Sequence, residues 1–162
     1  MGTTWPRVNI HNKTEYSWKK FMVCIWWDQL GVVYYELLNP SKTITGILHR
    51  SQLMRLRQAL KEKRLRYYSR HDKISLLHDN SCPHAAVPVK KYLKILDWEV
   101  LPHPPYSSDI APSDYHLFRS MAHALSEQRF TSCEGTKNWV DSWIASKDKE
   151  FFRLGIRALP ER

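Results

Sequence analysis

The chain has 162 residues, of which 43% are hydrophobic, and it carries a net charge of +9. A chain of this length and apolar content can bury one core, which excludes a disordered protein. Its longest apolar run, Phe21 to Trp27, is far too short to cross a bilayer, and no apolar signal segment follows Met1. Three widely spaced cysteines exclude a disulfide framework, so we expect a soluble intracellular protein.

The positive charge is concentrated in one segment of the chain. Residues 48–73 hold nine basic and two acidic side chains, a net +7, whereas residues 1–47 carry +2 and residues 74–162 are neutral overall. Such a cluster favours a polyanionic partner. A solvated helix face explains the same cluster equally well, so charge alone does not decide between the two.

The first half of the chain predicts a hairpin and a helix. Residues 1–19 are polar, show no clear periodicity and remain unassigned, and residues 20–162 form one domain. The β-branched and aromatic runs 21–27 and 31–38 flank a polar break, which predicts an antiparallel hairpin. Residues 44–68 follow as a helix, because leucines at 53, 56 and 60 form one apolar stripe.

The second half alternates strands with helices. Residues 73–80 predict a short buried strand, Pro83 opens a helix to about Leu96, and residues 98–106 begin as a strand that prolines end. Further helices are predicted over 113–126, after the capping-box pattern at 131–134, and over 149–159. A hairpin followed by helix-connected strands indicates an α/β protein with helices on the faces of its sheet.

Two aspartates lie where these elements predict a site. Asp79 ends the apolar strand, Asp114 begins a later helix, and 34 residues separate them. Sites in open α/β sheets form at the carboxyl ends of strands, and two carboxylates brought together need a cation between them. Mg²⁺ and Mn²⁺ are hard cations that take such oxygen ligands. The alternative, in which both aspartates only stabilise helix N-termini, stays open.

Three long motifs carry a resemblance to a known family: LLHDNSCPHAA at 76–86, WEVLPHPPYSSDIAPSDYHLF at 98–118 and CIWWDQLGVVYYELLNP at 24–40. They resemble the catalytic domain of mariner-type DNA transposases, from about residue 20 to the end of the sequence. The resemblance implies a ribonuclease-H-like mixed sheet with flanking helices, and metal-dependent cleavage and strand transfer of transposon ends. It implies that Asp79 and Asp114 are the second and third catalytic aspartates and hold Mg²⁺ or Mn²⁺. It also implies a site-shaping role for His78, Asn80 and His84.

The same resemblance implies DNA as the partner, the nucleus as the location and no membrane. A homodimer or a full-length transposase are the protein partners to test. Because the family must hold DNA near its site, the basic helix supplies the candidates for phosphate contacts. These candidates are Arg50, Arg55, Arg57, Lys61, Lys63, Arg64 and Arg66.

The sequence departs from the family at its N-terminal side. The family's first aspartate lies on an earlier strand, in an Asp-Glu-x-x-Trp-like motif that this sequence does not contain, and no helix-turn-helix region is recognisable. We therefore expect an N-terminally truncated domain whose first strand is missing, whose metal binding is weakened and which is inactive alone. Asp28 is a candidate replacement, although aspartate is also a common turn residue; Glu15 and Glu36 have no better claim. The alternatives are a non-catalytic DNA-binding module, a decayed relic and a chain that folds poorly.

Overall fold

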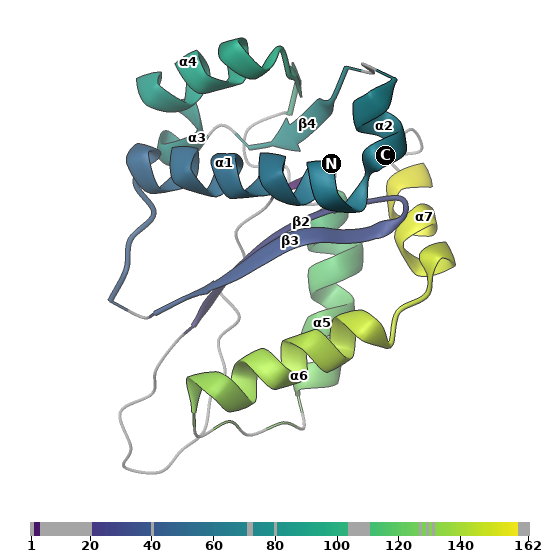
Figure 1. The fold of residues 1–162 in the computed structure, drawn as a ribbon. Coiled ribbons are helices and arrows are strands. Elements are labelled where there is room, and N and C mark those ends of the chain that lie inside the picture. The colour runs from purple at the N-terminus through teal and green to yellow at the C-terminus, as the bar shows by residue number, and fades with distance from the viewer. Residues whose placement is uncertain are drawn as a thin grey trace.

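The computed structural model describes residues 2–3, 21–39, 41–70, 73–79, 81–103, 111–126, 128, 130 and 132–158, and the side chains of residues 2, 3, 67, 68 and 114 lie outside this description. Within these residues, a five-stranded mixed sheet has helices on both faces, which confirms the predicted class (Figure 1). The strands are β1 (Gly2–Thr3), β2 (Met22–Asp28), β3 (Gly31–Leu38), β4 (Ser75–His78) and β5 (Glu99–Leu101). The helices are α1 (Gly46–Lys63), α2 (Leu65–Ser69), α3 (Cys82–Ala85), α4 (Val87–Leu96), the π-helix η2 (Ser113–Phe118), α5 (Arg119–Leu125), α6 (Cys133–Ala145) and α7 (Lys149–Arg157).

The sheet has the order β3-β2-β1-β4-β5. β2 and β3 form the predicted antiparallel hairpin, and β4 runs parallel to β1 and β5. The prediction that the first strand is missing is wrong, because β1 lies between β2 and β4. Gly2 pairs with both Trp27 and Leu77, and Thr3 pairs with His78. The sheet therefore takes its central strand from the segment that the sequence left unassigned.

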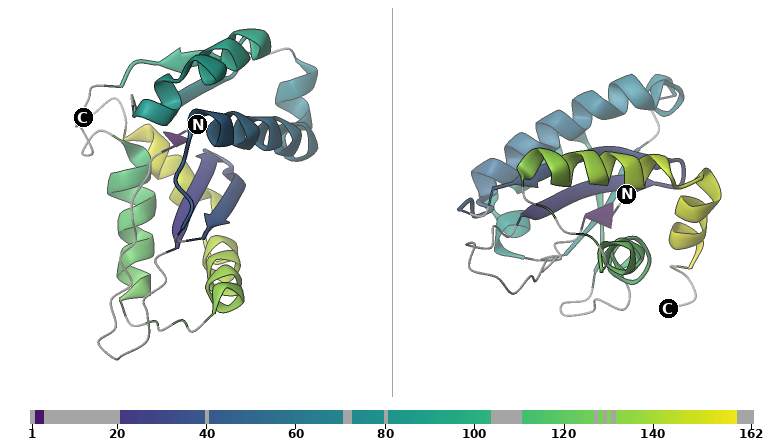
Figure 2. Two further views of the ribbon diagram at one scale, coloured as in Figure 1. Left: turned by 90° about the vertical axis from the view of Figure 1, so that its left-hand side faces the viewer. Right: turned by 90° about the horizontal axis from the view of Figure 1, so that it is seen from below.

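Alternation along β2 divides the interior into two cores. Cys24 and Trp26 point toward α1 and α4, where they pack with Leu53 and Leu56 in one buried cluster. Val23, Ile25 and Trp27 point to the opposite face, on which η2, α5, α6 and α7 lie (Figure 2). Trp27 is completely buried there. Because both faces of the strand are covered, the run from Val23 to Trp27 reads as continuously apolar instead of alternating.

The long basic helix predicted at 44–68 is divided in two. Thr45 caps α1 by accepting a hydrogen bond from the Leu48 backbone N–H at 3.2 Å. The helix ends at Arg64, whose φ of −128° and ψ of 45° are not helical, and α2 begins one residue later. The Arg64 side chain turns toward β2, where it pairs with Asp28. This tertiary contact accounts for a break that helix periodicity does not show.

The helix predicted from Pro83 to Leu96 is also divided. Ala86 is extended, with φ of −62° and ψ of 143°, and separates α3 from α4. Pro88 has no N–H to donate to the carbonyl of His84, so one continuous helix would lose a hydrogen bond at this point. The break turns α4 back along α1, and these two helices pack side by side on one face of the sheet.

The C-terminal helices follow the sequence prediction closely. The Ser132 hydroxyl caps α6 by accepting from the Gly135 backbone N–H at 3.0 Å, one residue later than the predicted capping box. The Asp148 carboxylate caps α7 by accepting from the Phe151 N–H at 2.8 Å. The helix predicted over 113–126 begins as the π-helix η2 and continues as α5. Among the described helices, none combines the length and the apolar character that a membrane crossing requires.

Candidate metal centre

Asp79 directly follows β4, where the strand leaves the sheet. Its side chain is 35% exposed, and its Oδ1 accepts a hydrogen bond from the Ser81 backbone N–H at 3.1 Å. Partial burial by itself raises the pKa of this carboxyl, but hydrogen bonds from His84 and Ser81 outweigh burial and lower the pKa below its ordinary value. Asp79 is therefore ionised at neutral pH, as a metal ligand must be.

His84 holds one oxygen of this carboxylate. Its Nδ1 lies 2.5 Å from Asp79 Oδ1 and 3.1 Å from the Asp79 carbonyl oxygen, so the proton belongs on Nδ1. The side chain of His84 is fully buried. The hydrogen bonds from His84 Nδ1 and from the Ser81 backbone N–H both go to Oδ1. The geometry therefore leaves Oδ2 as the oxygen that a cation can bind.

Two further histidines bury the ring of His84. His78 stacks on it with ring centroids 4.9 Å apart, and His49 of α1 lies at 4.3 Å. Burial, and then the nearby His84, lower the pKa of His49 to about 3 and that of His78 to about 4. Both rings are thus neutral and act as aromatic packing. The described residues contain no group of three or more His, Cys, Asp or Glu side chains that could hold a metal ion by themselves.

Asp114 is the second residue of η2. The residue before it, Ser113, is completely buried and accepts a hydrogen bond from the Trp27 indole N–H at 2.8 Å. The side chain of Asp114 and all of Asn80 lie outside the described residues. That Asp79 and Asp114 share one cation therefore stays a prediction.

Asp28 occupies a different environment. One of its oxygens accepts from Arg64 Nε at 2.8 Å, and the other accepts from an Arg64 terminal nitrogen at 2.9 Å and from the Leu30 N–H at 2.8 Å. Gly2 of β1 pairs with Trp27 of β2 and with Leu77 of β4, so these three residues lie at one level of the sheet. Asp28 comes one residue after Trp27, and Asp79 comes two residues after Leu77. Because β2 runs antiparallel to β1 and β4 runs parallel to it, the two aspartates lie on opposite sides of that level. With strands about 4.8 Å apart and a rise of about 3.3 Å per residue, the two Cα atoms are about 14 Å apart. This geometry argues against Asp28 as a ligand in the same site.

Glu36 is also engaged. It accepts hydrogen bonds from Tyr34, Arg55 and the Gln52 amide, the last at 3.0 Å. Its pKa is lowered, because these bonds outweigh the burial that by itself raises the pKa. A carboxylate with so many internal donors belongs to the packing between β3 and α1. Glu15 lies outside the described residues.

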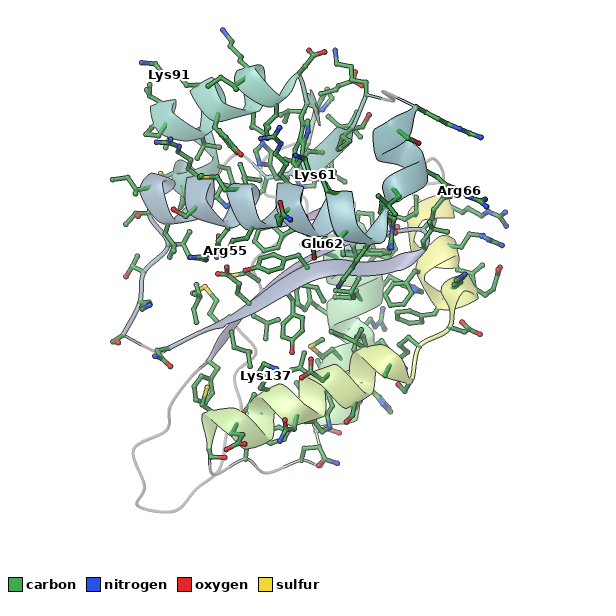
Figure 3. All side chains as sticks on the ribbon, in the orientation of Figure 1. Arg55, Lys61, Glu62, Arg66, Lys91 and Lys137 are labelled. Atoms are coloured by element: carbon green, nitrogen blue, oxygen red, sulfur yellow. The ribbon has the colours of Figure 1, made fainter. Side chains whose placement is uncertain are left out.

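The seven candidate phosphate contacts divide by their surroundings. Arg64 pairs with Asp28, and Lys63 donates to the carbonyl of Val33 at 2.8 Å, so both are tied to the hairpin. Arg55 pairs with Glu36 although its side chain is 54% exposed. Arg50 lies over the Tyr92 ring at 5.9 Å. Figure 3 shows Arg55 and Lys61 on α1 and Arg66 on α2. The remaining candidate, Arg57, lies on α1.

Sequence reasoning missed His49 and the contact between Trp27 and Ser113. His49 precedes Leu53 by four residues, so it extends the apolar stripe of α1 by one turn, and this spacing marks a buried position. The hydrogen bond from Trp27 to Ser113 joins residues 86 positions apart. No local pattern indicates a pairing at that separation.

The mixed sheet, covered on both faces and carrying an ionised carboxylate at the end of its parallel strand β4, has the architecture of a ribonuclease-H-like domain. A family model described as "Transposase (partial DDE domain)" matches residues 6–70. The Mariner Mos1 transposase of Drosophila mauritiana is 54% identical over 144 residues, which is 89% of this chain and 42% of that protein. Histone-lysine N-methyltransferase SETMAR of Homo sapiens is 38% identical over 144 residues, which is 89% of this chain and 21% of that protein.

Solved structures agree with these sequence matches. The crystal structure of the catalytic domain of Mos1 mariner transposase has a TM-score of 0.91 at 49% identity, covering 99% of this chain and 76% of that chain. The Mos1 mariner paired end complex with Mn has a TM-score of 0.92 at 44% identity, covering 99% and 52%. The chain belongs to the mariner transposase family, and its fold is that of the family's catalytic domain. It spans less than half the length of the curated relatives it matches.

Proposed function

We propose that this domain binds a divalent cation between Asp79 and Asp114 and acts on transposon DNA ends. The observation that carries the proposal is Asp79 itself, which is ionised, fixed through Oδ1 and open at Oδ2. Relatives support the cation, since the Mos1 catalytic domain has been solved with Mn and with Mg. They also support the DNA, since one Mos1 structure is a paired-end complex with a left transposon end.

The donor set fits Mg²⁺ or Mn²⁺. Carboxylate oxygens are the ligands that hard cations prefer, and the buried neutral histidines nearby offer no competing set. When bound, the cation would supply positive charge to the attacking and leaving oxygens of a phosphodiester. The chain's own contribution is positional. His84 and Ser81 hold Oδ1, so that Oδ2 keeps one direction relative to the sheet.

The same proposal includes weak metal binding and no strand cleavage by this chain alone. β1 lies beside β4, yet neither Gly2 nor Thr3 has a carboxylate. Gly2 pairs with Leu77, two residues before Asp79, so by alternation positions 2 and 79 face the same side of the sheet. Their Cα atoms are about 8 Å apart by strand geometry, within reach of two carboxylates sharing a cation. A carboxylate introduced at position 2 is therefore a candidate third ligand.

Mn²⁺ titration followed by amide NMR tests this proposal, because Mn²⁺ broadens the signals of nearby residues. We expect selective broadening of residues 78–84 and 113–118 in the wild-type chain. Asp79→Asn should abolish it, whereas the matched variant Asp97→Asn, on a side chain that is 91% exposed, should leave it intact. Broadening that is spread over the surface, or that survives Asp79→Asn, would refute the metal site.

A second function, sequence-independent DNA binding, is favoured by the net +7 of residues 48–73. Contacts to phosphates release counterions, so affinity should fall steeply with salt and vary little with sequence. Affinity for unrelated duplexes, measured over a range of salt concentrations, tests it, and a flat salt response would contradict it. Action on transposon ends in chromosomal DNA implies a nuclear location. Light scattering with and without DNA would reveal a homodimer.

A further inference from the structure

The segment that carries Asp114 has an uncommon conformation. η2 is a six-residue π-helix, Ser113–Phe118, that continues directly into α5. π-helical turns are rare and are found mostly at functional sites, since their backbone is less favourable than that of an α-helix. Such a turn persists where surrounding contacts hold it. The contacts around η2 therefore decide where its second residue, Asp114, lies.

One contact ties η2 to the sheet. The indole N–H of Trp27 donates to the Ser113 hydroxyl at 2.8 Å, and both side chains are completely buried. Trp27 pairs with Gly2, which in turn pairs with Leu77 of β4. The first residue of η2 is thus fixed at the level of the sheet where β4 approaches Asp79.

Two contacts tie η2 to α7. The Tyr115 hydroxyl donates to the Gly155 carbonyl at 2.8 Å, and His116 Nε2 donates to the Phe151 carbonyl at 2.7 Å. These carbonyls are four residues apart, so they lie on one face of α7. The His116 ring is also stacked on Trp27, with centroids 6.5 Å apart. Neighbouring residues of η2 are therefore bound to the same face of one helix.

Gly155 permits this close approach. A Cβ atom at position 155 would lie 2.6 Å from His116 Cδ2 and 2.8 Å from Trp27 Cη2, well inside contact distance. Any larger residue would push α7 away from η2 and from the sheet. The two carbonyl acceptors on α7, those of Phe151 and Gly155, would then move away from η2 together with the helix.

We propose that Trp27, Ser113, Tyr115, His116 and α7 form a clamp that positions Asp114 for metal binding; the residues concerned are positioning residues and touch no substrate. This inference rests on the metal site proposed above. It predicts that loosening the clamp weakens the Asp114 side of the site and leaves the Asp79 side intact, because Asp79 is held separately by His84 and Ser81.

The test uses Tyr115→Phe and Ser113→Ala, which remove one hydroxyl each and keep the packing. Tyr35→Phe is the matched control, since it removes a hydroxyl that donates to Asp141, between β3 and α6. In Mn²⁺ titrations followed by NMR, we expect the two clamp variants to lose broadening at residues 113–118 relative to 78–84. Their affinity for Mn²⁺ should fall about fivefold, as for loss of one hydrogen bond. Tyr35→Phe should match the wild type.

The outcomes separate this inference from the proposed function. If the wild-type chain shows no selective broadening near Asp79, the metal site itself is refuted. If broadening near Asp79 is present and the clamp variants keep wild-type broadening over residues 113–118, the site stands and the clamp is overturned. Gly155→Ala should have a larger effect than Tyr115→Phe, and the thermal unfolding midpoint of each variant without metal shows whether its fold is intact. An equal loss of broadening in Tyr35→Phe would also overturn the clamp.

Discussion

Asp28 and Asp79 both follow the last core residues of a strand, yet their carboxylates differ in what remains available. Both oxygens of Asp28 accept hydrogen bonds from Arg64, whose side chain is only 13% exposed. At Asp79 the hydrogen bonds from the His84 imidazole and from the Ser81 backbone N–H both go to Oδ1. A carboxylate paired at both oxygens holds elements together, whereas one paired at a single oxygen can also bind a cation. Sequence position at a strand end does not distinguish these two cases.

The surrounding charge reinforces the difference. At Asp28 the guanidinium neutralises the carboxylate, and the pair joins the β2–β3 turn to the end of α1. At Asp79 the partner is the imidazole of His84, and the two rings packed on that imidazole, His49 and His78, are buried and neutral. Among the residues that the structure describes, Asp79 therefore has no guanidinium beside it, and it receives no positive charge from His49 or His78.

The largest expected effect comes from adding a carboxylate on the Asp79 side. Gly2→Asp should produce metal-dependent cleavage of transposon ends where the wild-type chain shows none, because position 2 faces the same side as Asp79. Misplacing a reacting group by 1 Å lowers the reaction rate by about 10²-fold, so adding a whole ligand should raise the cleavage rate by at least about that factor. A cleavage assay with Mn²⁺ measures it.

Two control variants test whether this gain of cleavage depends on the proposed site. Gln29→Asp places a carboxylate next to Asp28 and should leave the chain inactive. Asp79→Asn in the Gly2→Asp background should abolish cleavage. Cleavage by the unmodified wild-type chain that depends on Asp79 would contradict the proposed inactivity, and cleavage that survives Asp79→Asn would indicate a contaminating nuclease.

The next effect is on stability and falls on Asp28. Asp28→Asn should lower the free energy of unfolding by about 2 kcal/mol, because a partly buried guanidinium loses its charged partner. Asp79→Asn should cost less, since the amide oxygen can still accept from His84. Urea unfolding of both variants measures the difference, with Asp97→Asn as the exposed control. Equal losses in the two variants would mean that Asp79 is a structural residue of the same kind.

A change of stability that is smaller per pH unit is expected from the protonation of His49. Its folded-state pKa of about 3 lies below the ordinary 6.5, so below pH 6.5 the unfolded chain binds the proton first. Stability should then fall as pH falls from about 6.5 toward 4, by up to about 1.4 kcal/mol per pH unit. His49→Phe should reduce this slope by that amount, measured by urea unfolding at several pH values. The charges near His49 are those of His84, His78 and Asp79, and Asp79 titrates below this window. An unchanged slope would contradict a neutral buried His49.

The sequence alone predicted the layered α/β class, the hairpin, and most helices and strands, because each has a local apolar pattern. It also located Asp79 at the end of β4. It failed at β1, since Gly2–Thr3 is two residues long and carries no β-strand signal. That strand is defined by pairing with Trp27 and Leu77, which are distant in sequence.

The partners of each carboxylate could not be predicted from the sequence either. Asp28 and Arg64 are 36 residues apart, and their pairing depends on how α1 packs across the hairpin. His49 reaches His84 through the packing of α1 on α3. Local periodicity predicted that these helices exist, but it does not determine which polar groups meet between them. The two functions of aspartate, structural partner and candidate ligand, become distinct only after packing.

The smallest expected effect is on the salt dependence of DNA binding, and it should differ between the basic residues Arg64 and Arg66. Arg64 is committed to Asp28, whereas Arg66 lies on the exposed surface of α2 (Figure 3). If the basic segment binds DNA phosphates, Arg66→Gln should reduce the slope of log affinity against log salt by about 0.9, the contribution of one contact. Arg64→Gln should leave that slope unchanged and lower stability instead, because it breaks the pair with Asp28. Fluorescence anisotropy at several salt concentrations measures the slopes, with folding of each variant checked by urea unfolding. A change of slope in a folded Arg64→Gln variant, with none in Arg66→Gln, would mean that the Asp28 pair opens on DNA and that Arg64 contacts phosphate.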